Sequence, residues 1–308
     1  MKITAASINI SERKGVAKKP IPRAELDMNG ITVDAHAGDW HRQISLLGTP
    51  SIRRFESRMS RSINPGEFGE NLTVDGIDLN EVSVLDHFRI GGVDLEITQI
   101  GKTCHGDDCA IFREVGKCVM PKEGLFARVI SPGVIEAGQE MQYLPRPFKV
   151  RVITVSDRAS AGKYTDLSGP RLTELVQEHY SGSRWHLETE HEIVPDDPEK
   201  IRAAIQHAVS SETDLVFTTG GTGIGPRDFT VDVVEEMADK TIPGIMENIR
   251  IKSGTKNPNA LLSRSVCAVI GSSIVYTLPG SVKAVEEYLQ EIWKTSDHMI
   301  TMLHGIGH

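Results

Sequence analysis

The sequence predicts two domains, a mainly β domain followed by a three-layer α/β domain with a mostly parallel sheet. The length of 308 residues is typical of two domains. Short β-type runs fill the chain as far as about residue 144, and strands alternate with helical segments after residue 149. Between these parts, LPRPFK (144–149) has two nearby prolines, which resist both helix and central strand. We therefore place the linker there and expect domains over residues 1–146 and 147–308.

The first domain is expected to be a β barrel or sandwich. Its β-type runs are bounded by turn residues, and glycine and aspartate separate them at VDG (74–76) and IGG (90–92). In chain order the runs are KITAASINI, ENLTV, SVLDHFRIGG, VDLEITQIG and FARVI. The charged stretch SIRRFESRM (51–59) predicts a short helix.

The second domain is expected to alternate strands with helices, which implies a parallel sheet. Strands are predicted in VRVITVS (150–156), HLETEHEIV (186–194) and TDLVFTT (213–219). Helices are predicted in SGPRLTELVQEHY (168–180), PEKIRAAIQHAVSS (198–211), TVDVVEEMADK (230–240) and SVKAVEEYLQEIWKTSDHMITML (281–303). Ser168 is the candidate cap of the first of these helices, with Pro170 near its first turn.

The composition argues against several classes of protein. The net charge of −8 and the pI near 5.8 argue against nucleic acid as a general partner, although they allow small anionic ligands. Four cysteines are too few for a disulfide scaffold in a chain of this length. The N-terminus has no apolar signal region, and the longest apolar-leaning stretch, SVCAVIGSSIVYTL, is too short to span a membrane. We therefore expect a cytoplasmic protein.

The stretch FTTGGTGIGPRD (217–228) is a candidate phosphate loop because it follows a predicted strand and precedes a predicted helix. Glycines there let backbone N–H groups approach an anion, and the next helix adds partial positive charge. The stretch lacks the Lys-Ser/Thr pair of a P-loop, and the third glycine of a dinucleotide fingerprint would fall on Pro226. The alternative is a tight connection that needs glycine only for steric reasons.

Aspartates lie at the end of this stretch and after another predicted strand. Asp228 would repel a bound phosphate unless a cation lies between them, and Mg²⁺ is the usual one. Asp196 and Asp197 in VPDD follow another strand, where they either cap the next helix or place a carboxylate at the same edge of the sheet. Polar loops at 154–169 and 278–281 follow two further strands. Because ligands bind at the carboxyl ends of parallel strands, we expect all four loops to converge.

The motifs VSDRASAGKYTDLSGP, IVPDD, TTGGTGIGPRDFT and LPGSVKAVEEYL, in this order, resemble those of the MogA/MoaB family of molybdenum-cofactor biosynthesis proteins. The resemblance covers about residues 147–308. It implies a molybdopterin-binding α/β fold, usually trimeric or a dimer of trimers. It also implies transfer of AMP from Mg-ATP to the terminal phosphate of molybdopterin, with release of pyrophosphate. The two aspartates important in the family fall on Asp196 and Asp228, which we predict to be catalytic and to hold the metal.

We predict that the four loops bind the substrates, so that a phosphate contacts the glycine amides. The candidate binding residues are Ser156, Asp157, Thr219, Gly220, Gly221, Thr222, Gly223, Pro279, Gly280 and Ser281.

The first domain contains a cysteine cluster. Cys104, Cys109 and Cys118, with His105, are candidate zinc ligands, but their spacing is looser than that of paired C-x₂-C knuckles. Buried, inert cysteines are the second interpretation. The third is a reactive Cys104, since nearby Lys102 and His105 would lower its pKa.

The same domain resembles the MOSC family through GDWHRQISLL, NPGEFGENLTVDGIDL, LEITQIGKTCH and KEGLFARVISPGVIEAGQE. The match covers nearly all of residues 1–144. It implies a mainly β, MOSC-like barrel that binds molybdenum cofactor or carries sulfur on a cysteine, and Cys104 occupies the motif position. His36 and His41 are then ligands, pocket-lining groups or ordinary hydrogen-bonding groups. Arg42 and Arg128 either bind a pterin phosphate or lie on the surface.

Two resemblances to one pathway indicate a fused molybdenum-cofactor protein. We expect the second domain to adenylylate molybdopterin with Mg²⁺ and ATP, and the first to bind the cofactor or to carry sulfur on Cys104. The expected partners are a cysteine desulfurase, a molybdenum-insertion protein and further copies of the chain in a trimer, with no nucleic acid and no membrane. The alternative is a carrier that binds molybdopterin or molybdenum cofactor without catalysis. Retention of both Asp196 and Asp228 favours the enzyme.

Overall fold

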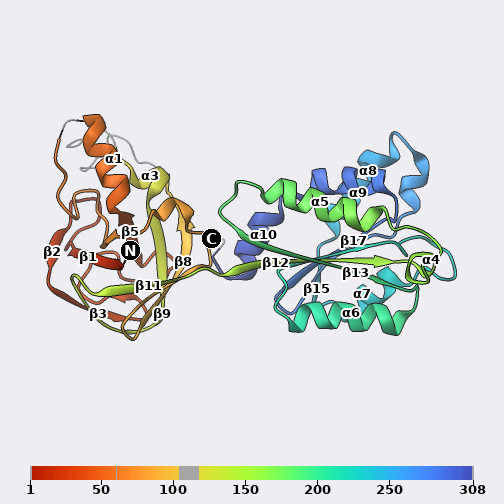
Figure 1. The fold of residues 1–308 in the computed structure, drawn as a ribbon, viewed down its shortest axis with the longest axis horizontal. Coiled ribbons are helices and arrows are strands. Elements are labelled where there is room, and N and C mark those ends of the chain that lie inside the picture. Colours follow the sequence, from red (N-terminus) through yellow and green to blue (C-terminus); the bar gives the residue numbers. More distant parts are fainter. Residues whose placement is uncertain (1, 60, 104–117, 307–308) are drawn as a thin grey trace. The chain divides into compact units, whose positions relative to one another are not determined.

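The computed structural model describes residues 2–59, 61–103 and 118–306. It forms two compact units. The N-terminal unit comprises Met1–Arg146 and Arg184–His186, and the C-terminal unit comprises Pro147–Ser183 and Leu187–His308. Each unit has its own sheets and core, and Figure 1 shows their elements. In the described part of the chain, no helix has both the length and the hydropathy that a membrane span requires.

Seven strands close into a barrel within the described residues of the N-terminal unit (Figure 1). Their order is β11-β7-β8-β9-β5-β6-β1, and pairing of β11 with β1 completes the ring. The strands are β1 (Ile3–Ile10), β5 (Ile44–Gly48), β6 (Leu72–Asp75), β7 (His87–Ile90), β8 (Val93–Ile100), β9 (Leu125–Ser131) and β11 (Glu140–Leu144). The prediction of a mainly β first domain is confirmed, and its form is a barrel.

The remaining strands of this unit lie outside the ring. β2 (Lys19–Ile21) pairs with β1. A separate small sheet contains β3 (Arg23–Asp27), β4 (Gly30–Ile31) and β10 (Gly133–Glu136). The helix predicted at 51–59 is confirmed as α1 (Thr49–Met59), and two short helices, η1 (Leu79–Glu81) and α3 (Met120–Glu123), complete the described elements.

Alternation along the strands builds two apolar layers in this unit. Leu46 of β5 points into the barrel core with Ile8, Leu72, Phe88 and Leu95, all fully buried. Its neighbour Leu47 faces the other way, as the two-residue period of a strand requires. There it joins a second cluster with Ile52, Phe55, Ile63, Phe68, Met120 and Phe126. This cluster attaches α1 and α3 to the barrel wall.

A mixed, mostly parallel sheet forms the centre of the C-terminal unit, with the order β13-β12-β14-β17-β16-β15. β12, β14 and β17 are parallel neighbours, whereas β16 and β15 are antiparallel. The strands are β12 (Pro147–Val155), β13 (His186–Val194), β14 (Leu215–Thr219), β15 (Lys240–Thr241), β16 (Cys267–Ile270) and β17 (Ser273–Leu278). The sheet therefore has the predicted parallel centre and an antiparallel edge.

Helices cover both faces of this sheet (Figure 1). One layer contains α5 (Ser168–Tyr180), α8 (Pro243–Gly254) and α9 (Val282–Ile292), and the opposite layer contains α6 (Pro198–Ser210) and α7 (Thr230–Met237). The remaining helices are α4 (Asp157–Ser160), α10 (Ser296–Leu303) and η3 (Pro258–Leu262). The predicted three-layer arrangement is confirmed.

Three local predictions need correction. β12 starts at Pro147, inside the predicted linker, because the first residue of a strand tolerates proline and Phe148 is fully buried. The single helix predicted over 281–303 is two helices, α9 and α10, with a break at Trp293, whose ring stacks on His179 at a centroid distance of 4.2 Å. The helix predicted over 230–240 is shorter, because α7 ends at Met237 and Lys240 lies in β15. No helix was predicted where α8 begins, at Pro243.

The cap of α5 is also not the predicted one. Ser168 lies inside the first turn, and the carboxylate of Asp166 takes the capping role. Asp166 Oδ1 accepts the amides of Ser168 and Gly169 at 3.0 Å each, while its Oδ2 accepts the hydroxyl of Thr154 at 2.6 Å. Burial opposes the charge, but these hydrogen bonds and nearby His191 hold the pKa of Asp166 below its ordinary value.

We expect Asp166→Ala to destabilise the C-terminal unit by about 1–2 kcal/mol, because it removes the cap of α5 and the partner of Thr154. Asp166→Asn should cost less, since one amide oxygen still accepts hydrogen bonds. Because the folded pKa is lowered, the charge of Asp166 stabilises the fold above the ordinary carboxyl pKa, and this contribution is lost as the pH falls towards the folded value. Urea unfolding at neutral and acidic pH checks this. An Asp166→Ala midpoint equal to wild type at neutral pH would contradict it.

Candidate functional site

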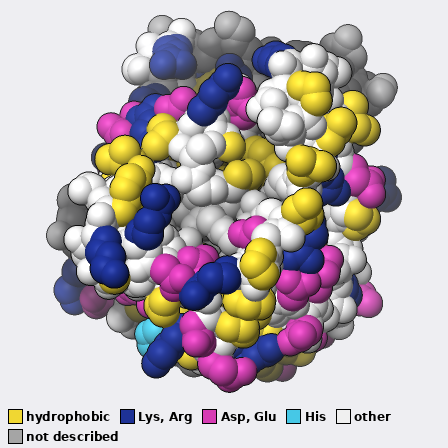
Figure 2. Space-filling model, turned by 90° about the vertical axis from the view of Figure 1, so that its right-hand side faces the viewer, with side chains coloured by type: hydrophobic (Ala, Val, Ile, Leu, Met, Phe, Trp, Pro, Cys, Tyr) yellow, Lys and Arg dark blue, Asp and Glu magenta, His cyan; other side chains and the backbone are white. Residues whose placement is uncertain are grey.

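Four strand ends of the C-terminal unit meet at one edge of the sheet. In the parallel register, Thr154 of β12 lies beside Thr219 of β14, and Thr219 lies beside Leu278 of β17. The end of β13 joins them, since the amide of Ser156 donates to the carbonyl of Val194 at 2.8 Å. Figure 2 views the end of this unit at which α4 lies in Figure 1. It shows a hollow with uncharged atoms in its floor and hydrophobic and charged side chains around it.

Close backbone packing holds the loop within FTTGGTGIGPRD (217–228), called the glycine loop below, against the ends of the neighbouring strands. Gly220 has a φ of +106°, and a Cβ there would lie 2.3 Å from the carbonyl oxygen of Val155. Its amide donates to the carbonyl of Leu278 at 2.9 Å, and the hydroxyl of Thr219 donates to the carbonyl of Pro279 at 3.1 Å. The ends of β12, β14 and β17 are therefore in direct contact, and only glycine fits at position 220.

The amides of Gly221, Thr222 and Gly223 are available to a ligand. Neighbouring groups of the loop are used: the carbonyl of Gly221 accepts from Thr230, and the amide of Gly225 donates to Asp228. No hydrogen bond with any described residue occupies the three consecutive amides at 221–223. Successive backbone N–H groups in a glycine-rich turn suit an anion such as a phosphate.

Asp228 is oriented by its own loop. Its Oδ2 accepts the amide of Gly225 at 2.7 Å, and its amide donates back to the carbonyl of Gly225 at 3.1 Å. A Cβ on Gly223 would lie only 2.7 Å from the same oxygen, so the loop fits closely around the carboxylate. Asp228 Oδ1 makes no hydrogen bond within the described structure.

Arg264, which the sequence reading did not identify, fixes the loop from outside. Its guanidinium donates to the carbonyls of Gly223 and Asp228, both at 2.9 Å, and forms a two-pronged ion pair with Asp232 at 2.7 and 2.6 Å. The hydrogen bonds from Arg264 lower the pKa of Asp232. Arg264 lies 36 residues after Asp228 and belongs to no motif that sequence reasoning recognised, so no local signal indicated this contact.

The structure separates the roles of the two neighbouring aspartates. Asp197 is the cap of α6, because its Oδ1 accepts the amides of Glu199 and Lys200 at 3.0 and 3.1 Å. Asp196 instead joins Asp157: its Oδ2 accepts the amide of Asp157 at 2.7 Å, and its amide donates to Asp157 Oδ1 at 3.1 Å. Both interpretations of VPDD therefore hold, each for a different residue.

The carboxylates at this edge have the ligand chemistry that Mg²⁺ prefers. Asp196 Oδ1, like Asp228 Oδ1, has no hydrogen bond to the described part of the chain, and hard oxygen ligands of this kind are those that Mg²⁺ prefers. Within the described ranges, no set of three or more His, Cys, Asp or Glu is arranged as a metal cage. A magnesium ion held by one or two carboxylates and by substrate phosphates needs no such cage.

A groove of about 270 Å³ begins at the loop that follows β17 (278–281), called the β17 loop below. Pro279 and Ser281 line it, and Ser281 caps α9 by accepting the amide of Ala284 at 3.3 Å. Lys256 and Lys283 also line this groove and supply positive charge. The predicted residues of the β17 loop thus connect the glycine loop to a groove whose charged lining is two lysines and Glu287.

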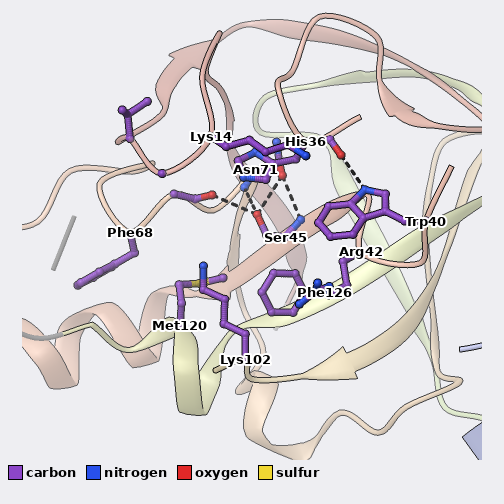
Figure 3. Close-up of a pocket in the computed structure, with 13 residues that line it drawn as sticks. Lys14, His36, Trp40, Arg42, Ser45, Phe68, Asn71, Lys102, Met120 and Phe126 are labelled. Carbon is purple, nitrogen blue, oxygen red and sulfur yellow. Dashed lines mark hydrogen bonds between the residues drawn. The ribbon is translucent and has the colours of Figure 1, made fainter. Parts of the chain in front are cut away.

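The N-terminal unit has a second candidate site, a pocket of about 370 Å³ (Figure 3). Phe68, Met120 and Phe126 supply apolar surface, and Lys102 lies beside them. Across the pocket, Lys14 and Arg42 lie over the ring of Trp40, at 5.2 and 4.7 Å from its centroid. This combination of apolar surface and cations suits a flat, anionic ligand.

Polar residues with buried hydrogen bonds form another part of the pocket wall. The hydroxyl of Ser45 donates to Asn71 Oδ1 at 2.9 Å, as Figure 3 shows. His36, which lines the pocket, is held by the buried Lys18, whose Nζ lies 3.1 Å from the Nδ1 atom of His36 and 2.6 Å from Asp34. These contacts fix the orientation of the groups that face the ligand space.

Of the other predicted groups in this unit, Arg42 and Lys102 line the pocket, whereas Arg128 pairs with Glu96 at 2.7 Å. Burial and the charges of Arg42 and Arg128 lower the pKa of His41. Cys118 packs against the apolar cluster at α1. The predictions for Cys104, His105 and Cys109, including the zinc site, lie outside the described residues.

Family models match both units. Residues 151–298 match a model described as "Probable molybdopterin binding domain", and residues 33–142 match the MOSC domain. The chain is 34% identical to the molybdopterin adenylyltransferase of Helicobacter pylori over 157 aligned residues. The aligned segment covers 51% of this chain and 88% of that protein. The chain belongs to the MogA/MoaB family and carries a MOSC domain as well.

Relatives with other names support the same family. The molybdenum cofactor biosynthesis protein B of Bacillus cereus is 38% identical over 144 residues, which is 46% of this chain and 81% of that protein. The molybdenum cofactor biosynthesis bifunctional protein of Chlorobaculum tepidum is 34% identical over 167 residues, or 54% of this chain. The chain spans about half, 51%, of the length of that bifunctional protein. Both family resemblances read from the motifs are confirmed.

We expect Gly220→Ala to destabilise this MogA/MoaB unit by about 2 kcal/mol or more, because it combines left-handed strain with a clash against the Val155 carbonyl. Gly162→Ala is the matched control, since Gly162 also has a positive φ, of +68°, but its added Cβ meets nothing within 4 Å. The control should cost only about 1 kcal/mol. Urea unfolding of both variants measures the difference. Equal costs would show that the close contact at Gly220 contributes nothing.

Proposed function

We propose that this protein acts in molybdenum-cofactor biosynthesis and that its C-terminal unit transfers AMP from ATP to molybdopterin. A terminal phosphate oxygen of molybdopterin attacks the α-phosphorus of ATP, the bond to the bridging oxygen breaks, and pyrophosphate leaves. One observation carries the proposal: the glycine loop with its available amides lies at the same sheet edge as Asp196 and Asp228. Relatives named molybdopterin adenylyltransferase support this reaction.

Each part of the site has a role in this proposal. The amides of Gly221, Thr222 and Gly223 bind a phosphate, and Gly220 and Gly280 allow the close approach of the two loops. Thr219, Ser156 and Asp157 hold the neighbouring strand ends in place. Lys256 and Lys283 of the groove bind further phosphate charge, from the pyrophosphate portion of ATP or from the pterin phosphate.

Asp196 and Asp228 are proposed to hold a magnesium ion through their available oxygens. When bound, Mg²⁺ neutralises phosphate charge and thereby favours nucleotidyl transfer. Asp228 is aimed by the glycine loop and Asp196 by Asp157, so the protein fixes both carboxylates before the substrates arrive. Catalysis then rests on positioning and charge neutralisation, as is general for transfer at phosphorus.

Asp228→Asn tests this proposal, because asparagine keeps an acceptor for Gly225 but removes the charge. We expect AMP transfer to fall about 100-fold or more, since loss of metal-based charge stabilisation raises the barrier by several kcal/mol. Asp239→Asn is the control: Asp239 likewise accepts an amide, that of Gly271, at 2.7 Å. The assay follows adenylylated pterin and pyrophosphate with molybdopterin and Mg-ATP. Wild-type protein that binds molybdopterin but makes neither product would instead be a carrier.

For the N-terminal unit we propose binding of the molybdenum cofactor, or of its pterin precursor, in the 370 Å³ pocket. Lys14, Arg42 and Lys102 would hold the phosphate, and the apolar side chains would contact the rings. We further propose that the thiolate of Cys104, two residues after Lys102, attacks the outer sulfur of a persulfide on a cysteine desulfurase. The donor S–S bond breaks, the desulfurase cysteine leaves as a thiolate, and Cys104 carries the persulfide. The rival role for Cys104 is that of a molybdenum ligand. A molybdenum-insertion protein as partner and a trimer formed through the C-terminal unit complete the proposal.

Sulfur transfer can be tested by mass spectrometry after treatment with a cysteine desulfurase and cysteine. We expect a persulfide adduct of about 32 Da on Cys104 and none in Cys104→Ser. Cys267 is an internal control, because it is 1% exposed and burial raises its pKa to about 12. An adduct on Cys267 alone, or on no cysteine, would count against sulfur transfer. Molybdenum that purifies with wild type but not with Cys104→Ser would support the rival role.

A further inference from the structure

Arg227 places a positive charge among the carboxylates of the candidate site. Its Nη2 atom forms an ion pair with Asp157 Oδ2 at 2.5 Å and donates to the carbonyl oxygen of Asp196 at 3.2 Å. Arg227 also directly precedes Asp228 in the chain. One guanidinium nitrogen therefore contacts both members of the Asp157–Asp196 pair.

This ion pair is easily exchanged. The side chain of Arg227 is 64% exposed and that of Asp157 is 39% exposed. Exposed pairs of this kind contribute little to stability, because water solvates both partners well. A guanidinium binds a phosphate through two parallel hydrogen bonds, which are stronger than its single contact with Asp157. A phosphate entering the site therefore competes effectively for Arg227.

Arg264 differs from Arg227 in this respect. Arg264 donates to two loop carbonyls and is paired through two nitrogens with Asp232, so moving it would break four contacts. The contacts of Arg227 within the described structure are those with Asp157 and Asp196. Arg264 is thus a structural element of the loop, and Arg227 is the arginine with freedom to change partners.

We propose that Arg227 is an exchangeable counter-cation of the metal site. Without substrate it neutralises Asp157 and repels a divalent cation from Asp196 and Asp228. When a nucleotide phosphate enters, Arg227 moves onto that phosphate, and its charge then no longer repels a metal ion from the carboxylates. This inference rests on the proposed function for the identity of the phosphate, and it assigns Arg227 a phosphate-binding role that nothing else in the sequence indicated.

The proposal makes two predictions of opposite sign for Arg227→Gln. Removing the guanidinium lets a divalent cation bind more tightly to the protein alone, because a repelling charge is gone. The same change weakens phosphate binding, because a ligand for it is gone. A purely structural role would weaken both or leave both unchanged. Since the Arg227–Asp157 pair is exposed, we expect the variant to fold normally, which thermal unfolding checks.

The experiment uses full-length protein without nucleotide and Mn²⁺ as the probe, detected by electron paramagnetic resonance. We expect Arg227→Gln to bind Mn²⁺ about tenfold more tightly than wild type. Arg158→Gln is the matched control, since Arg158 follows Asp157 in the chain but lies over the ring of Tyr164, at 5.1 Å, and should change the affinity less than twofold. Calorimetry should show that Arg227→Gln binds inorganic pyrophosphate about tenfold more weakly than wild type does, whereas Arg158→Gln binds it as wild type does.

The outcomes separate this inference from the proposed function. Unchanged or weaker Mn²⁺ binding by Arg227→Gln, or no measurable Mn²⁺ binding by either protein, overturns the role of Arg227 even if wild type transfers AMP. Tighter Mn²⁺ binding with weaker pyrophosphate binding supports that role even if no AMP transfer is found, and only the proposed function then fails. Arg227→Lys should restore weak Mn²⁺ binding, because it keeps the charge.

Discussion

The site of the C-terminal unit depends on the parallel pairing of β12, β14 and β17. Parallel strands end at the same edge of the sheet. The strand pairing alone therefore brings together three loops that are distant in sequence. The contact between Gly220 and the Val155 carbonyl makes this edge tight, and the hydrogen bond from Gly220 to Leu278 links the third strand. The available amides and the carboxylates are arranged on this frame.

In the N-terminal barrel, one strand contributes to two apolar clusters. Because β5 is buried on both faces, it belongs at once to the barrel core and to the cluster beneath α1. The pocket lies next to that cluster, and Phe68, Met120 and Phe126 belong to both. Its apolar wall is therefore part of the folded core, while its cationic side chains come from loops. Such a pocket keeps its shape while its charged groups adjust to a ligand.

How much could be read from the sequence depended on the range of the interaction. Local patterns predicted most strands and helices, and the strand-end rule predicted that Asp196 and Asp228 lie at one edge. Arg264 was missed because its partners lie more than 30 residues away. The capping role of Asp166 was missed because Ser168, an equally common capping type, stands directly at the start of the helical pattern. The pairing of β1 with β11 that closes the barrel could not be predicted from local sequence patterns, because these strands lie at opposite ends of the domain sequence.

The hydrogen bond between Asp228 and the amide of Gly225 has a thermodynamic consequence. The loop whose amides are proposed to bind a phosphate also holds the carboxylate of Asp228, so we expect a change in one to affect the other. Any ligand that stabilises one shape of the loop also selects one direction of Asp228. Linkage then requires reciprocity: if a phosphate raises the affinity for the metal, the metal raises the affinity for that phosphate by the same factor. This coupling acts through the loop itself, and the proposed movement of Arg227 from Asp157 to the phosphate would add to it.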